Sequence, residues 1–329
     1  MPLDIPVYKP RTYLRNGHLM TIYAWAKPRT FPRLPPPSER FFDVAPDARV
    51  LAHCHWQVNP AGHPVLLALH GLEGSSSAHY MRGLADKAFA GGFSVVLLNQ
   101  RNCGGTEQHA AGLYHSGLTG DAAHVIHEMA RDDGVQQVVV AGYSLGGNLA
   151  LKLAGEYGDA PPPQLRGVCA VSPVMELADC VRALERRQNL VYHWNFVRAL
   201  RGRMRRKARW NPGRFATARL AQVRSVRQFD ELYTAPHFGF RDASDYYHRA
   251  SAMRVIDRIR VPALIITAQD DPFVPAETFR DPRVTGNPHL RIIATRHGGH
   301  CGFVTEPAEG DDGYWAERRI VEFAREVVA

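Results

Sequence analysis

Short apolar runs alternate with longer segments of helical spacing through most of this chain. The runs are rich in β-branched residues and have the length of strands that are buried on both faces. They lie at 65–69, 94–98, 138–141, 167–171, 263–267 and 290–294. Segments whose apolar positions recur with helical spacing lie at 80–89, 121–131, 145–157 and 315–328. This order predicts an α/β fold with a mostly parallel central sheet and helices on both of its faces.

The first 39 residues differ from the rest in being rich in proline, arginine and aromatic residues. They predict an irregular arm that packs along the core and has little regular structure. Within this arm, the segment 15–22 is more specific than a linker requires. Residues 40–44 and 50–56 then predict two strands joined through Pro46-Asp47, which would form a hairpin at the edge of the sheet.

The alternation of strands and helices stops between residues 173 and 260. Leu177, Val181 and Leu184 keep helical spacing in this segment. Its length and its position after a central strand predict a mostly helical cap above the carboxyl ends of the strands, where ligands bind to parallel sheets. We therefore expect an arm at 1–39, an α/β core formed by 40–172 and 261–329, and a helical cap insertion at 173–260.

The segment around Ser144 carries the strongest chemical signal. A buried strand ends in Gly142-Tyr143-Ser144-Leu145-Gly146, and a helix follows at once. A Gly-x-Ser-x-Gly turn between a strand and a helix is a nucleophile elbow, which lifts the serine hydroxyl clear of neighbouring side chains. The glycines relieve crowding around a strained residue, and the Leu145 amide lies at the helix start, where negative charge is favoured. We expect Ser144 to be a catalytic nucleophile.

A serine nucleophile needs a histidine that takes its proton and a carboxylate that orients the histidine. In proteins with a nucleophile elbow, the acid and then the histidine follow the serine along the chain. Asp270 and Asp271 come directly after the strand at 263–267, and Asp271 is preferred because it stands at the tip of the turn. His297 and His300 follow the next strand on a glycine-rich loop, which lets an imidazole project into the site. Of these two, His300 is preferred.

Negative charge on the substrate oxygen needs two hydrogen-bond donors. The backbone amide of Leu145 is expected to be one, and the amide of Leu72, on the loop after the first parallel strand, the other. His70, on the same loop, is expected to hydrogen-bond within the loop and to take no part in the chemistry. The substrate pocket is expected to include Gly71, Tyr143, Leu177, Val181 and Trp194.

Motifs along most of the chain extend this pattern. They are 16–19 with Thr21, 70–75, 114–117 with Asp121, 142–148, 270–273 and 299–300. On these residues the chain resembles the YheT-like family of α/β-hydrolases, which is related to plant embryogenesis-associated proteins and mammalian abhydrolase-domain lipases. The resemblance implies hydrolysis of carboxylic esters, acylglycerols or phospholipids, with a triad on Ser144, Asp271 and His300. Asn102 and Met20 depart from the family pattern, and the membrane anchor of the mammalian relatives is missing.

The chain has 329 residues and a formal net charge of +8. Arginine is dense between Arg182 and Arg227, where Glu185 is the one acid and tryptophans interleave. Three interpretations stay open for this part of the cap: a solvated helical face, a surface that approaches an anionic membrane or an acidic substrate, or binding of nucleic acid. No RRM, KH or helix-turn-helix signature supports nucleic acid, which is therefore the least favoured of the three.

The sixteen histidines include close pairs, but no His-Glu-x-x-His or Cys-x-x-Cys spacing accompanies them. We therefore expect no metal and no other cofactor. Five cysteines without framework spacing predict reduced thiols, with Cys103 and Cys301 near the pocket, in a cytoplasmic protein. No signal peptide and no membrane-spanning run is recognised. The expected substrate is a small ester or a lipid-like molecule, but thioester or amide hydrolysis and acyl transfer on the same triad stay open as alternatives.

Overall fold

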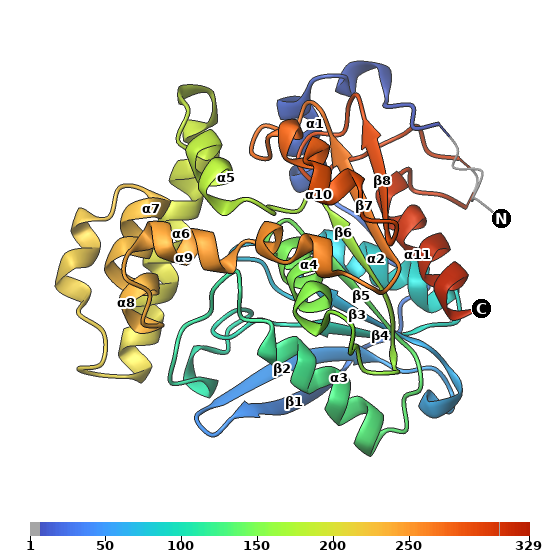
Figure 1. Ribbon diagram of the computed structural model, residues 1–329, viewed down its shortest axis with the longest axis horizontal. Helices are drawn as coiled ribbons and strands as arrows, with labels where there is room; N and C mark the ends of the chain where they lie inside the picture. The colour runs from blue at the N-terminus through green and yellow to red at the C-terminus, as the bar shows by residue number, and fades with distance from the viewer. Residues whose placement is uncertain (1–6, 309) are drawn as a thin grey trace.

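The computed structural model describes residues 7–308 and 310–329, which are built around one eight-stranded sheet (Figure 1). Its strands are β1 (Ser38–Ala45), β2 (Ala48–His55), β3 (Val65–Leu69), β4 (Ser94–Leu98), β5 (Val138–Tyr143), β6 (Leu165–Val171), β7 (Ala263–Ala268) and β8 (Leu290–Thr295). They lie in the order β1-β2-β4-β3-β5-β6-β7-β8. The six strands from β4 to β8 in this order are parallel, and the hairpin β1–β2 is antiparallel. The predicted mostly parallel sheet and its edge hairpin are confirmed.

Helices cover both faces of this sheet, as predicted. They include α2 (His79–Ala90) and α11 (Trp315–Val328) on one face, and α3 (Gly120–Asp132) and α4 (Leu145–Tyr157) on the other. Successive residues of β3 divide between the faces: Leu66 packs with α2 and α11, whereas Leu67 packs with α3 and α4. A parallel strand buried on both faces is therefore apolar at every position, which explains why the pattern alone identified these strands.

The segment 173–260, all of which is described, contains helices and short helical turns and no strand. Its helices are α5 (Leu177–Leu184), α6 (Leu190–Trp210), α7 (Val226–Phe229), α8 (Ala235–His237) and α9 (Ala243–Ala250), and α10 (Pro282–Thr285) follows between β7 and β8. Figure 1 shows α5 to α9 grouped at one side of the sheet. Buried Asn148 of α4 links this group to the core, because its amide donates to Ser116 and Ala250 carbonyls and accepts from the Ala252 amide.

The arm contains a helix that the sequence pattern did not predict. Helix α1 (Gly17–Ala26) is capped by Asn16, whose side chain accepts hydrogen bonds from the amides of His18 and Leu19. The prediction of an arm with little regular structure was therefore wrong at these residues. Leu19, Ile22 and Trp25 are apolar and exposed, so α1 has no polar outer face and its helical period is weak in the sequence. The first six residues of the predicted arm lie outside the described residues.

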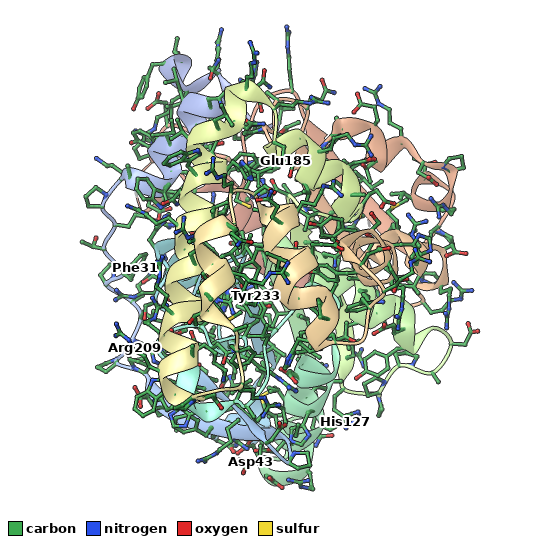
Figure 2. The ribbon with its side chains drawn as sticks, turned by 90° about the vertical axis from the view of Figure 1, so that its left-hand side faces the viewer. Phe31, Asp43, His127, Glu185, Arg209 and Tyr233 are labelled. Atoms are coloured by element: carbon green, nitrogen blue, oxygen red, sulfur yellow. The ribbon has the colours of Figure 1, made fainter. Side chains whose placement is uncertain are left out.

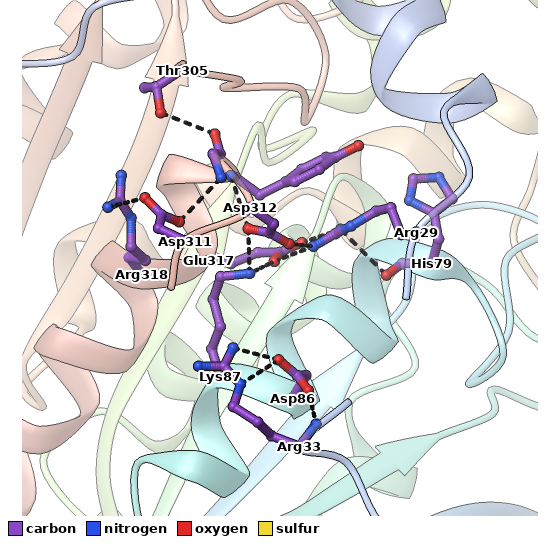
Figure 3. A network of polar contacts seen from close by, with 12 residues as sticks. Arg29, Arg33, His79, Asp86, Lys87, Thr305, Asp311, Asp312, Glu317 and Arg318 are labelled. Carbon is purple, nitrogen blue, oxygen red and sulfur yellow. Dashed lines mark hydrogen bonds and ion pairs between the residues drawn. The ribbon is translucent and has the colours of Figure 1, made fainter. Parts of the chain in front are cut away.

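A group of four charged side chains, of which Arg29, Lys87 and Glu317 are buried and Asp312 is partly exposed, fastens the arm to the core (Figure 3). Arg29 donates two hydrogen bonds of 2.6 and 2.7 Å to Glu317 on α11 and one of 2.7 Å to Asp312. Lys87 of α2 lies 2.8 Å from both carboxylates. Burial raises the pKa of Asp312, but Lys87 and Arg29 outweigh burial and lower this pKa to about 2. The two cations and two anions compensate one another in a place where a single unpaired charge would be costly.

Replacing Arg29 by methionine should destabilise the fold by about 3 kcal/mol, because the buried Glu317 would lose its bidentate partner and keep Lys87 as its remaining cation. Urea unfolding of the two proteins measures this difference. Arg291→Met is the matched control, since Arg291 also makes a bidentate pair with a glutamate of α11, Glu326, but both side chains are about a third exposed. The control should cost no more than about 1 kcal/mol. Equal losses in the two variants would contradict the argument from burial.

Candidate active site

Ser144 stands at the sharp turn between β5 and α4. Its backbone has φ 53° and ψ −112°, a conformation that side-chain-bearing residues rarely adopt. A Cβ atom on Gly142 would lie 2.0 Å from the carbonyl oxygen of Gly146, and one on Gly146 would lie 2.2 Å from that of Leu69. Both glycines are therefore required by the close approach of three backbone segments. The turn has the geometry that the sequence predicts for a nucleophile elbow.

Asp271 and His300 are paired and buried beside each other. The His300 Nδ1 atom lies 2.9 Å from Asp271 Oδ2, and the other carboxylate oxygen accepts from the amides of Phe273 and Val274 at 2.8 and 3.1 Å. The side chain of Asp271 is fully buried. Burial lowers the pKa of His300, but the Asp271 carboxylate outweighs burial and raises this pKa well above its ordinary value. The pairing fixes Nδ1 and leaves Nε2 of the ring for another partner.

Asp270 and His297, the less favoured candidates for the acid and the histidine, also pair with each other. The His297 Nδ1 atom lies 3.3 Å from Asp270 Oδ2, and the other Asp270 oxygen accepts from the amide of Gly299 at 2.9 Å. Both side chains are partly exposed. Among the described residues, the pocket that contains Ser144 is lined by His300 and not by His297 or Asp270. The two neighbouring aspartates therefore hold different histidines, and one of these histidines, His300, lines the pocket together with Ser144.

A pocket of about 90 Å³ lies between the elbow and the cap. Ser144, Leu72, Leu145 and His300 line it on the side of the core. The cap supplies mainly apolar residues, which include the expected Leu177 and Val181 and also Leu184, Phe196, Leu200 and Phe229. Arg203 and Asp230 are the charged residues of the cap wall, and burial raises the pKa of Asp230 to about 6. The pocket thus suits a largely apolar ligand with one polar region.

Three of the expected pocket residues do not line this pocket. Trp194 is 75% exposed on the outer side of α6, and Tyr143 is buried beneath the elbow against Tyr80. Gly71 lies close by but contributes only backbone, and a Cβ at this position would lie 3.4 Å from that of Ser144. Sequence reasoning missed Phe273, whose ring packs edge-on against His300 at 4.6 Å. Its place two residues after Asp271 was the available signal.

The loop after β3 has the features expected of an oxyanion site. The fully buried His70 accepts from the Gln100 amide through Nε2 and lies 2.7 Å from the Gly71 carbonyl through Nδ1. Burial lowers its pKa to about 4, so the ring is neutral, and its hydrogen bonds hold the loop in place. Among the hydrogen bonds of the described residues, none is donated by the backbone amides of Leu72 or Leu145. Two amides beside Ser144 are therefore free to donate to a ligand.

A buried ion pair joins this loop to the cap. Arg203 of α6 donates from Nε to Glu73 Oε1 at 2.6 Å, and both side chains are less than a tenth exposed. The guanidinium group also lies over the ring of Tyr114, whose hydroxyl accepts from the Glu73 amide. Sequence reasoning missed this contact, because it joins residues 130 positions apart. It fixes one wall of the pocket relative to the loop that carries Leu72.

Helix α1 of the arm packs directly on the loop that carries His300. The Thr21 hydroxyl accepts from the His300 amide at 2.8 Å and donates to the Gly17 carbonyl at 2.7 Å. A Cβ atom on Gly17 would lie 1.9 Å from the carbonyl oxygen of Asp270, and one on Gly299 would lie 2.5 Å from that of Gly17. The specific arm segment noted in the sequence is therefore a close-packed support for the acid and histidine loops.

Cys103 and Cys301, which the sequence places near the pocket, do not line it, whereas Cys180 of α5 does. Cys103 is buried, and burial raises the pKa of its thiol to about 12. The Cys301 thiol lies 3.7 Å from the carbonyl oxygen of Val171. All five cysteines are free.

Within 7–308 and 310–329, no helix combines the length and the apolar character needed to cross a bilayer.

Comparisons with known proteins identify the family and the fold of this chain. A family model described as alpha/beta hydrolase fold matches residues 64–307. The chain is 35% identical to YheT of Escherichia coli (strain K12), which carries the provisional name of an esterase, over 90% of this chain and 86% of that protein. It is 27% identical to phospholipase ABHD3 of Mus musculus, over 76% of this chain and 60% of that protein. The solved esterase Pf2001 of Pyrococcus furiosus shares the fold, with a TM-score of 0.57 and 15% identity over 91% of this chain and 96% of that one.

Proposed function

This chain belongs to the alpha/beta hydrolase fold family and to its YheT-like group, and from this premise we propose that it is a serine hydrolase acting through Ser144, His300 and Asp271. The enzyme class is that of the carboxylic-ester hydrolases. The observation that carries the proposal is that Ser144 and His300 line the same pocket, with His300 held by the buried Asp271 carboxylate. This constellation is the one that nucleophilic cleavage of an acyl group needs.

In the proposed mechanism, Ser144 Oγ attacks the ester carbonyl while His300 Nε2 takes its proton. Asp271 holds Nδ1 and stabilises the imidazolium that forms. The free amides of Leu72 and Leu145 donate to the oxyanion of the tetrahedral intermediate. His300 then protonates the leaving alcohol, and the acyl group stays on Ser144. A water molecule then attacks the acyl carbonyl while His300 takes its proton. His300 returns this proton to Ser144 Oγ as the acid leaves.

The pocket supports an ester with an apolar acyl part. Most of its cap wall is aliphatic or aromatic, from Leu177 to Phe229. The mouse relative is a phospholipase by name, which makes lipid-like esters part of the proposal. Acyl transfer and cleavage of thioesters or amides use the same groups, so the leaving group must be established by experiment.

A fluorophosphonate probe and a series of p-nitrophenyl esters from acetyl to palmitoyl test this proposal on the purified protein. We expect the probe to form a covalent adduct on the peptide that contains Ser144, and the esters to be hydrolysed with a chain-length optimum set by the pocket. Matched thioester and amide substrates should react more slowly than the best ester. A folded protein that neither reacts with the probe nor cleaves any of these substrates would rule out the serine-hydrolase function.

The rate should depend on pH through His300. Because only the neutral imidazole can accept the proton of Ser144, and because Asp271 raises the pKa of His300 above 6.5, kcat/KM for a neutral ester should rise with pH and reach its midpoint above 6.5. Removing the carboxylate charge in Asp271→Asn should move the midpoint of the residual activity to lower pH. A midpoint at or below 6.5 in the native protein would contradict the assignment.

Thr21 should position the histidine loop. Replacing it by valine removes the acceptor of the His300 amide, and we expect kcat to fall about tenfold or more with KM little changed, since small displacements of a catalytic group are costly. Thr21→Ser keeps the hydroxyl and should restore most of the rate. Steady-state kinetics of both variants measure the changes in kcat and in KM separately. Equal impairment of the serine and valine variants would show that the hydroxyl is not what matters.

A further inference from the structure

Helices α1 and α6 expose an unusual number of large apolar side chains. On α1 these are Leu19, Ile22 and Trp25, which share its outer face, and Trp25 is 71% exposed. On the first two turns of α6 they are Leu190, Val191 and Trp194, with Val191 and Trp194 exposed by 79% and 75%. Single exposed apolar residues are ordinary on protein surfaces, but a group containing two tryptophans is not.

The two helices lie side by side at this point. The rings of His18 on α1 and Tyr192 on α6 stack at 5.8 Å with an angle of 14°, and His18 Nδ1 lies 3.2 Å from the Tyr192 hydroxyl. Figure 2 shows the blue arm helix next to the end of α6 that lies near Glu185. The two sets of exposed apolar residues therefore lie on neighbouring helices, and we name them together the α1–α6 surface.

The two chain segments that form the α1–α6 surface carry charge of one sign, and Glu185, the acid that directly precedes the second segment, lies 3.8 Å from Arg227. The segments 7–33 and 186–229 contain no aspartate or glutamate. The exposed basic residues next to the apolar ones are Arg15 and Lys27 on the arm and Arg186, Arg187 and Arg198 on the cap. Other basic residues of α6 are used inside the protein: Arg203 pairs with Glu73, and the buried Lys207 donates to the carbonyls of Glu107 and Ala110. The arginine-rich cap is thus a solvated face only in part.

We propose that the α1–α6 surface docks on the headgroup region of an anionic lipid bilayer. Tryptophan and aliphatic side chains flanked by arginine and lysine are the composition that enters a membrane interface, where indole rings prefer the boundary and cations meet lipid phosphates. A second copy of this chain would bring two basic surfaces together in a symmetric dimer, which like-charge repulsion opposes. The charge therefore favours a membrane over a self-association interface.

The position of this surface would bring lipid close to the pocket. Tyr192, in contact with α1, packs against Phe273 at 4.7 Å, and Phe273 packs against His300. Phe196, one turn further along α6, lines the pocket. Docking does not depend on ester hydrolysis, so it can be measured on the Ser144→Ala protein, and its failure would leave the proposed reaction untouched.

Vesicle co-sedimentation tests the proposal with the full chain carrying Ser144→Ala. We expect at least tenfold stronger binding to phosphatidylcholine vesicles containing about 30 mol% phosphatidylglycerol than to phosphatidylcholine alone, and weaker binding in high salt. Adding Trp25→Ser and Trp194→Ser together should reduce binding at least tenfold. Trp210→Ser is the matched control, because Trp210 is equally a solvent-exposed tryptophan of α6 but lies about 24 Å further along the helix.

Three outcomes would overturn the proposal. The first is no binding to anionic vesicles by a protein whose thermal unfolding is cooperative. The second is an equal loss of binding in the Trp210 control, which would show a general effect of removing tryptophan. The third is a native dimer that dissociates when Trp25 and Trp194 are replaced, since a second copy would then occupy the surface. Analytical ultracentrifugation of the same variants identifies the third outcome.

Discussion

The Ser144→Ala protein should hydrolyse its best p-nitrophenyl ester at least about a thousandfold more slowly than the native protein, because no other group can form the acyl intermediate. The loss should be in kcat, with KM changed little, since the hydroxyl acts on the reacting carbon and contributes little to binding. The variant should also fail to react with a fluorophosphonate. Stopped assays with a high enzyme concentration measure the residual rate.

Folding should survive this change. Alanine removes one oxygen atom from a residue whose backbone is held by its own hydrogen bonds, from the Ser144 amide to the Val171 carbonyl and from the Asn148 amide to the Ser144 carbonyl. The free energy of unfolding should therefore change by less than about 1 kcal/mol. Native-like activity in the alanine variant would refute the role of Ser144.

Asp271→Asn should reduce kcat by about a hundredfold to ten-thousandfold, whereas Asp270→Asn should leave it within about threefold of the native value. The two residues are adjacent, carry the same charge and each contact a histidine. Only Asp271 holds the histidine that lines the pocket with Ser144. Asparagine keeps the shape but offers a neutral side chain, which no longer stabilises the imidazolium or fixes the tautomer of His300.

Parallel measurements on the matching histidines complete this test. His300→Gln should lose activity as strongly as Ser144→Ala, and His297→Gln should retain most of it. Thermal unfolding of all four variants separates loss of function from loss of fold. If Asp270→Asn or His297→Gln were the inactive members of their pairs, the assignment of the triad would have to be exchanged for the second pair.

Much of the core could be predicted from the sequence. The bounds of β3, α4 and α11 coincide with the predicted segments 65–69, 145–157 and 315–328. Strands buried on both faces must be apolar throughout, and helices on a sheet must be apolar on one side, so local pattern and global position agree. The elbow could be predicted for a similar reason, because two backbone approaches there exclude any side chain at Gly142 and Gly146.

The arm helix and the pocket wall could not be predicted in this way. Helix α1 is apolar on its exposed face as well as its buried one, so it has no period to detect. Trp194 and Phe196 are equally apolar and only two residues apart, yet one faces solvent and the other the pocket. Two positions along a helix differ by about 200° in direction, and only the packing of α6 decides which one turns inward.

The sequence by itself determined the elements, their order, and the short set of residues from which a triad can be drawn. The tertiary structure decided which aspartate holds which histidine, which residues line the pocket, and what the arm supports. The physical reason is how far apart along the chain the contacting residues lie. Strand and helix patterns, turns and the elbow arise from residues near one another in the chain, whereas the Arg203–Glu73 pair and the Thr21–His300 hydrogen bond join residues 130 and 279 positions apart. No local pattern records such contacts, and they exist only once the chain has folded.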